Sequence, residues 1–230
     1  MRLLDKFPVL LLDMNGTFMF GEDRFGAGED FHTTYRSVGG HKLSAEEVTR
    51  FIRACYYGMS RDYDDPERYD DFPSLTEGLQ RYARPPESEL PLLERVFTLH
   101  ELGIVPEWAA SVLCRLASTH KLAVVANICA PKQAWLEEFD RAGISGVFPY
   151  TVFSSDFRSI KPSPVLYREA LRGVGAQLHE ALFVGDSLRY DMEGAKRVGL
   201  STAWITPQPQ PHPSVDYLLS TLQEIEAHAA

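Results

Sequence analysis

The sequence is poor in the features that mark membrane, secreted and nucleic-acid-binding proteins. No apolar run in its 230 residues approaches the length of a membrane-spanning helix, and Met1 to Lys6 lacks the apolar centre and the cleavage site of a signal peptide. Lys and Arg total 23 against 32 Asp and Glu, and a formal net charge of -9 has the wrong sign for nucleic acids or anionic membranes. We therefore expect a cytoplasmic protein that binds no nucleic acid and no membrane, and whose partner is a small ligand.

Cysteine is also scarce. Cys55, Cys114 and Cys129 have neither the spacing of metal ligands nor the even count of a disulfide framework, so buried reduced thiols are expected. Hydrophobic residues make up 44% of the chain, enough to form one full core and a smaller insert. The composition leaves the oligomeric state open.

The first buried strand is followed directly by a carboxylate. Phe7 to Leu12 is an apolar run without polar alternation, which is typical of a strand covered on both faces, and Asp13 follows it. Ligands of open α/β sheets bind beyond the carboxyl ends of the strands, so Asp13 is a candidate site residue. Gly16 allows a tight turn there and Thr17 adds a hydroxyl, although a turn without a function has the same signature.

The second half of the chain alternates between strands and helices. Strands are predicted at 121–127, 150–154, 181–186 and 201–205, and helices at 106–119, 131–142, 165–174 and 190–198. A proline-rich linker over 207–213 leads to a last predicted helix over 215–227. This order predicts the α/β class, with a Rossmann-like, mostly parallel sheet.

A helical block interrupts this pattern after the first strand. Ser44 and Glu47 form a capping box before a helix, and further helices are predicted at 74–82 and 90–102. No strand is predicted between residues 31 and 103. We therefore expect residues 1–17 plus 104–230 to form the core and residues 18–103 to form an inserted helical cap.

Two segments of this block have other patterns. Aromatic residues around a Gly and charged turn at 18–26 predict a hairpin or flap over Asp13. Residues 62–71 are strongly acidic, and a solvated loop is favoured over a cation site because no ligand spacing accompanies the charges.

Polar side chains follow three of the buried strands. Asp13, Asn127 and Asp186 lie at strand ends that meet at one edge of a parallel sheet, and Asp191 follows one helical turn later. Lys161 precedes a Pro-Ser-Pro helix start that holds it extended. Carboxylates in this arrangement suit a hard cation.

These residues in this order resemble the haloacid dehalogenase (HAD) superfamily of phosphohydrolases. The matching stretches are 9–17, 124–127, 161–162 and 185–191, which span the predicted core. The resemblance implies a Mg²⁺-dependent phosphatase of a small phosphorylated metabolite. It also implies a type 1 helical cap that closes over the site and sets the substrate specificity.

The resemblance further implies residue roles. Asp13 attacks phosphorus to form an aspartyl-phosphate, and Mg²⁺ is held by Asp13, the backbone carbonyl of Asn15 and Asp186, with Asp191 nearby. Lys161 neutralises charge on the nucleophile and the phosphate.

The phosphoryl oxygens would be held by a second group of residues. The resemblance assigns this role to the Asn127 side chain and to backbone N–H groups around Met14 to Thr17, which include those of Gly16 and Thr17.

The chain departs from the family pattern at two positions. Phosphatases of the family have a second aspartate where this chain has Asn15, and a Ser or Thr where it has Ala126. The amide of Asn15 can neither protonate the leaving oxygen nor activate water, and loss of general acid–base catalysis typically costs roughly 10²–10⁴-fold in rate. Ala126 removes one hydrogen bond to phosphate. We expect reduced turnover.

Other functions remain as alternatives. One is a module that binds a phosphoester without hydrolysing it. A dehalogenase is disfavoured because Asp186 and Asp191 are both retained and no tyrosine stands two residues after Asp13. Phosphonate cleavage is disfavoured because Lys42 is the only candidate for a Schiff-base lysine in the cap. Four arginines could meet an anionic leaving group, although surface positions are commoner for them: Arg24, Arg36, Arg53 and Arg61.

Overall fold

A parallel sheet forms the centre of the protein, as seen in a computed structural model that describes residues 3–227. Its strands lie in the order β3–β2–β1–β4–β5–β6, and every neighbouring pair is parallel. The strands are Val9–Leu12 (β1), Lys121–Ala126 (β2), Tyr150–Phe153 (β3), Ala181–Gly185 (β4), Ser201–Ile205 (β5) and Tyr217–Leu219 (β6). The predicted α/β, Rossmann-like class is confirmed.

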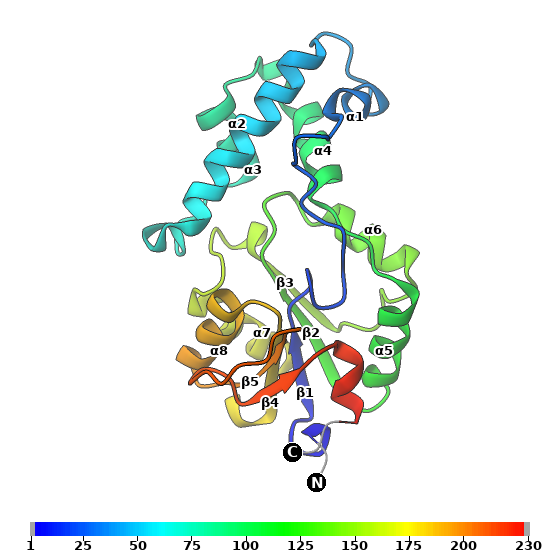
Figure 1. Ribbon diagram of the computed structural model, residues 1–230, viewed down its shortest axis with the longest axis vertical. Helices are drawn as coiled ribbons and strands as arrows, with labels where there is room; N and C mark the ends of the chain where they lie inside the picture. Colours follow the sequence, from blue (N-terminus) through cyan, green and yellow to red (C-terminus); the bar gives the residue numbers. More distant parts are fainter. Residues whose placement is uncertain (1–2, 228–230) are drawn as a thin grey trace.

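Helices cover both faces of this sheet (Figure 1). They are α5 (Glu107–Ala117), α6 (Gln133–Arg141), α7 (Pro164–Val174) and α8 (Glu193–Val198). Alternate residues of β1 point to opposite faces: Leu10 and Leu12 join the cluster that includes α5 and α6, whereas Val9 and Leu11 join that of α7 and α8. All four β1 residues are buried, which explains the absence of polar alternation.

Four further helices pack above the carboxyl ends of the strands (Figure 1). They are α1 (Phe31–Ser37), α2 (Ala45–Asp64), α3 (Leu75–Gly78) and α4 (Leu90–Glu101). The predicted capping box of Ser44 and Glu47 begins α2, and a second box of Ser74 and Glu77 begins α3. We call α1–α4 and their connections the helical layer.

Short helical turns complete the secondary structure. The 3₁₀ turns are Leu3–Lys6, Pro66–Arg68, Glu87–Glu89, Ser154–Asp156, Leu178–Glu180 and Leu222–Glu226, and the π turns are Leu79–Ala83 and Leu188–Met192. None of the helices over residues 3–227 is long and apolar enough to cross a membrane.

Of the predicted hairpin or flap at 18–26, the hairpin is wrong. This segment pairs with the chain that returns from the helical layer, because Phe20 and Ile104 exchange backbone hydrogen bonds of 2.9 and 2.8 Å in an antiparallel bridge. The Arg24 guanidinium donates to the Leu102 carbonyl at 2.9 Å and thereby joins the two segments. The returning segment supplies partners that local sequence could not reveal.

The predicted last helix over 215–227 is also wrong. Its first part is strand β6, which extends the sheet beyond β5, and Leu222–Glu226 is a 3₁₀ turn. Asp216 is held at the start of β6 by the Thr202 amide at 3.0 Å and the Lys196 ammonium at 2.6 Å. Pairing with the open edge of β5 therefore makes residues 217–219 a strand, although the spacing of the apolar residues there is typical of a helix.

The cysteines agree only in part with the expectation of buried thiols. Cys55 is buried and Cys129 is half-buried, whereas Cys114 is exposed. Cys129 lies in the loop after β2, beside the cavity described below.

Candidate active site

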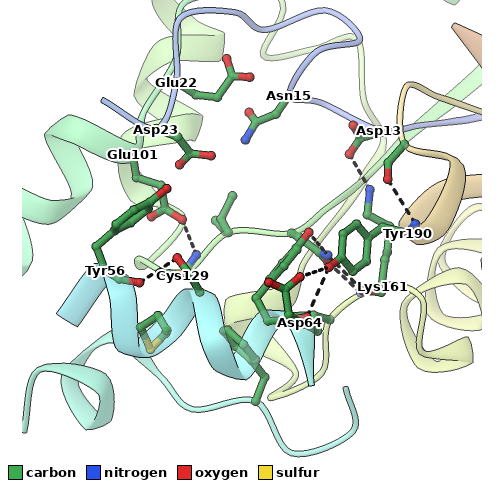
Figure 2. Close-up of a pocket in the computed structure, with 18 of the residues that line it drawn as sticks. Asp13, Asn15, Glu22, Asp23, Tyr56, Asp64, Glu101, Cys129, Lys161 and Tyr190 are labelled. Carbon is green, nitrogen blue, oxygen red and sulfur yellow. Dashed lines mark hydrogen bonds and ion pairs between the residues drawn. The ribbon is translucent and has the colours of Figure 1, made fainter. Parts of the chain in front are cut away.

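Lys161 lies between two carboxylates at the carboxyl end of the sheet. Its ammonium is 2.5 Å from Asp13 Oδ1 and 2.6 Å from Asp191 Oδ1, and all three side chains are buried. Figure 2 shows Lys161 reaching Asp13 from the opposite side of the site. The structure therefore brings together three residues that are separated by up to 178 positions in the sequence.

The backbone around Asp13 is fixed by the sheet. The Asp13 amide donates to the Val184 carbonyl of β4 at 2.8 Å, so strand pairing continues one residue beyond β1. Because β1 has β2 on one side and β4 on the other, Asp13 lies where the strand order reverses, which is the usual ligand crevice of such sheets.

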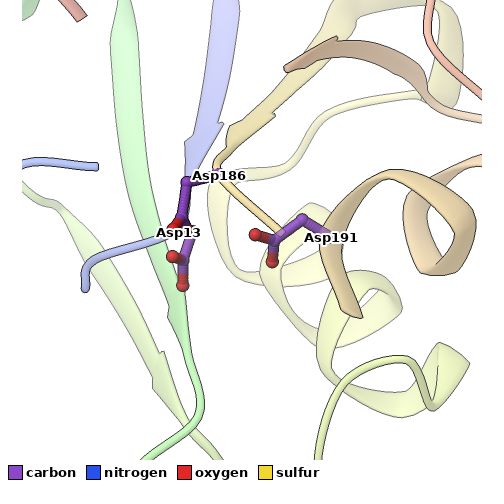
Figure 3. Close-up of side chains that lie close together, drawn as sticks. All are labelled: Asp13, Asp186 and Asp191. Atoms are coloured by element: carbon purple, nitrogen blue, oxygen red, sulfur yellow. The ribbon is translucent and has the colours of Figure 1, made fainter. Parts of the chain in front are cut away.

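Asp186 completes a cluster of three carboxylates (Figure 3). One oxygen each from Asp13, Asp186 and Asp191 lies within 4.8 Å of the others. Gly16 permits this approach: its φ is +73°, and a Cβ there would lie 2.3 Å from Asp186 Oδ2. Asp191 is oriented by the Ser187 amide, which donates to its Oδ2 at 2.9 Å.

The electrostatics of this cluster favour an added cation. Burial raises the pKa of Asp13, of Asp186 and of Asp191 to about 6 in each case, although the Lys161 charge opposes the rise. Burial lowers the pKa of Lys161, but the charges of Asp13 and Asp191 outweigh this effect and hold it above its usual range. The three carboxyls share one ammonium, so the cluster lacks positive charge.

Asn127 has its whole amide engaged. Its Oδ1 accepts from the Lys161 backbone amide at 2.8 Å, and its Nδ2 donates to Lys161 O at 3.2 Å and to the Tyr63 hydroxyl at 2.9 Å. In this structure Asn127 therefore positions the Lys161 loop and contacts the helical layer.

The turn after Asp13 also uses its own donors. The Gly16 amide donates to Met19 O at 2.9 Å and the Thr17 amide donates to Met14 O at 3.2 Å, so neither is free for a phosphoryl oxygen. Two polar atoms here are buried and without a hydrogen-bond partner in the described chain, namely Asn15 Oδ1 and Thr17 Oγ1. Such orphaned atoms indicate a place for a ligand or an ion.

A cavity of about 330 Å³ extends from this cluster towards the helical layer. Figure 2 shows Glu22, Asp23 and Glu101 at the end away from Lys161. Sequence analysis missed these three acids and the lining tyrosines Tyr63 and Tyr190. The sequence signals were the adjacency of Tyr190 to Asp191, the place of Tyr63 in the acidic segment, and the place of Glu22 and Asp23 in the segment predicted to lie over Asp13.

Four of the six acidic residues of segment 62–71 are exposed, in line with the predicted solvated loop, but the segment also docks on the core. The rings of Tyr63 and Tyr190 lie 4.5 Å apart, and the Tyr190 hydroxyl donates to Asp64 Oδ1 at 3.1 Å. The Ser163 hydroxyl donates to Asp70 Oδ1 at 2.5 Å. Arg158 pairs with Asp71 at 3.0 Å. The helical layer is thus held closed against the site.

Comparison with known proteins agrees with this geometry. A family model described as haloacid dehalogenase-like hydrolase matches residues 100–205. Glyceraldehyde 3-phosphate phosphatase of Methanopyrus kandleri is 29% identical over 182 residues, covering 71% of this chain and 77% of that protein. The crystal structure of a HAD phosphatase from Thermococcus onnurineus superposes with a TM-score of 0.64 at 24% identity, covering 96% of this chain and 97% of that one. The chain is thus similar in sequence and in fold to haloacid dehalogenase-like hydrolases.

Other relatives of this chain have different names. Ribulose-1,5-bisphosphate 5-phosphatase of Halopiger xanaduensis is 26% identical over 174 residues, covering 73% of this chain and 72% of that protein. L-2-haloacid dehalogenase from Xanthobacter autotrophicus has a TM-score of 0.62 at 20% identity, covering 96% of this chain and 97% of that one. At such identities the structural matches establish the fold and leave the reaction to be argued from the site.

Proposed function

We propose that this protein is a HAD-superfamily phosphatase of a small phosphorylated metabolite and that Asp13 is its nucleophile. One observation carries the proposal: a buried carboxylate lies 2.5 Å from a buried ammonium, and both side chains line the cavity. Phosphoryl transfer depends chiefly on positioning and charge neutralisation, which this arrangement provides. The phosphatase names of two relatives agree with it.

The reaction would proceed in two displacements. In the first, an Asp13 oxygen bonds to phosphorus and the ester P–O bond breaks, so that the leaving alkoxide takes a proton from solvent. In the second, water bonds to phosphorus and loses a proton to solvent while the aspartyl P–O bond breaks, which releases phosphate and restores the carboxylate. Lys161 neutralises charge in both steps, whereas the Asn15 amide can transfer a proton in neither. We therefore expect the second step to be slow.

The acidic cluster fits a divalent cation. Its three carboxylates are hard oxygen ligands within 4.8 Å of one another. Burial raises the pKa of each, and a cation among them would favour their charged forms. Asp13, Asp186 and the Asn15 carbonyl would hold Mg²⁺, with Asp191 in support. The ion would supply charge neutralisation for the phosphoryl group.

The division into core and cap is part of this proposal. Residues 18–103 would act as a cap on the core of residues 1–17 and 104–230, opening about the paired segments at 21–26 and 102–103. Three contacts would form the latch in the closed state, namely those of Tyr63 with Asn127, of Asp70 with Ser163 and of Asp71 with Arg158. Closure would exclude water from the cavity.

Hydrolysis of p-nitrophenyl phosphate with and without Mg²⁺ tests the proposal. We expect slow release of phosphate that Asp13→Asn abolishes and that Asp140→Asn, at an exposed position, leaves unchanged. Binding without any release would favour the alternative of a phosphoester-binding module. Release of chloride from L-2-chloropropionate, with no release of phosphate, would show a dehalogenase instead.

A further inference from the structure

The end of the cavity that faces away from Lys161 is acidic. Glu22, Asp23 and Glu101 line it (Figure 2). The Glu101 side chain is buried, and its two oxygens accept from the backbone amides of Cys129 at 2.5 Å and Ala130 at 3.0 Å. The carboxylate is therefore fixed in place between α4 and the loop after β2.

Aromatic rings form the adjoining wall. Phe25 stacks on Tyr56 with ring centroids 4.4 Å apart and an interplanar angle of 17°. The ring centroid of Phe97 lies 4.6 Å from that of Phe25. All three rings line the cavity. Aromatic faces beside carboxylates attract cations, above all ammonium groups that have lost part of their hydration.

The two arginines that are candidates to neutralise these acids donate hydrogen bonds to backbone carbonyls instead. Arg24 donates to the carbonyls of Gly21 and Leu102, and Arg53 donates to those of Gly26 and Ala27. Among the described residues that line the cavity there are seven carboxyl side chains and one ammonium, that of Lys161. An anionic leaving group would therefore meet only like charges beyond the phosphoryl end.

We infer that the substrate is a phosphorylated amine, whose ammonium group lies among Glu101, Asp23 and the aromatic wall while its phosphoryl group lies at Asp13. This inference rests on the proposed function, since it takes the Asp13 end of the cavity as the phosphoryl site. It predicts discrimination against bisphosphates and phosphorylated carboxylic acids.

The state of the acids agrees with this assignment. Burial, together with the Asp23 charge, raises the pKa of Glu101 to about 7, and burial with the Glu22 charge raises the pKa of Asp23 to about 6. Glu22 Oε2 is buried and has no hydrogen-bond partner among the described residues. A bound ammonium group would supply the missing positive charge and hydrogen-bond donors.

A matched series of two-carbon phosphoesters tests the inference. Calorimetry with Mg²⁺ would measure binding of 2-aminoethyl phosphate, 2-hydroxyethyl phosphate and 2-phosphoglycolate to the wild type and to Asp13→Asn, which cannot turn them over. We expect the amine to bind at least about tenfold more tightly than the carboxylate, with the neutral alcohol between them.

Charge-neutral variants locate the effect. Glu101→Gln and Asp23→Asn should each reduce the amine preference by about threefold or more and leave 2-hydroxyethyl phosphate affinity unchanged. Glu107→Gln, on the exposed face of α5, is the matched control. Asp23 lies outside the helices and strands, so its variant remains informative if Glu101→Gln fails to fold.

The outcomes separate the two proposals. Equal or tighter binding of 2-phosphoglycolate, no binding of any of the three, or an amine preference that survives in both variants would overturn the inference. Preferential binding of the amine without hydrolysis of any phosphoester would support the inference and refute the phosphatase proposal.

Discussion

Replacing Asn15 with aspartate should introduce the proton-transfer group that the proposed catalytic set lacks. The Asn15 Oδ1 atom is already buried and lacks a partner, so the carboxylate would occupy the same space without displacing a hydrogen bond. Burial near other carboxyls would raise its pKa, which favours a protonated acid able to serve the leaving oxygen.

The size of the effect follows from the missing step. General acid–base catalysis contributes roughly 10²–10⁴-fold, so we expect Asn15→Asp to raise the steady-state kcat by about 10²-fold or more. This corresponds to about 2.7 kcal/mol of transition-state stabilisation. Mg²⁺ affinity should change little, because the proposed ligand at this position is the backbone carbonyl. Without metal, the free energy of unfolding of Asn15→Asp should be about 1–3 kcal/mol lower than that of the wild type, because the substitution buries a further acid without a partner.

The assay combines steady-state release of phosphate with acid-quenched trapping of the phosphoenzyme. Wild-type protein should accumulate aspartyl-phosphate because its second step lacks a base, and Asn15→Asp should not. Asn15→Leu, which has a similarly branched side chain but no polar group, should remain as slow as the wild type. Asn15 precedes Gly16, a pairing prone to deamidation, so intact mass and peptide mapping of residues 7–24 must accompany each rate. Fully amidated wild type turning over as fast as Asn15→Asp would refute the reasoning.

Three further predictions concern the charge cluster and the latch. Lys161→Met should destabilise the protein by about 3–5 kcal/mol and abolish vanadate binding, because Asp13 and Asp191 would lose their shared cation. Lys121→Met is the control. Unchanged vanadate affinity in Lys161→Met would show that Lys161 is not part of the site. Without metal, the free energy of unfolding should fall as pH rises from about 4 to about 6, because Asp13, Asp186 and Asp191 keep protons in the folded state that the unfolded state has released. Thermal unfolding should accordingly show a larger stabilisation by Mg²⁺ at pH 7.5 than at pH 5, and equal stabilisation at both would count against the cation site. Arg158→Gln should raise KM by about two- to fivefold, because Arg158 would lose its exposed ion pairs with Asp71 and Glu77. Lys132→Gln, which breaks an ion pair within the core, is the control and should leave KM unchanged.

The sequence by itself predicted the core and the place of the candidate site. Unbroken apolar runs predict buried parallel strands because both faces of such strands are covered, and the strand ends must then meet at one edge. That argument placed Asp13, Asp186 and Lys161 together before any coordinates. The capping box at Ser44 similarly fixed the start of α2, because a cap depends only on residues three positions apart.

Only the tertiary structure decided the features that depend on distant partners. Residues 217–219 form a strand because the edge of β5 is open beside them, and Phe20 pairs with Ile104 because the chain returns there. Asn127 is committed to Lys161 and Tyr63, and Glu101 to the loop after β2, through contacts between residues at least 28 positions apart. Hydrophobic period and local capping carry no information about such pairs, since their geometry exists only once the helical layer has packed against the sheet.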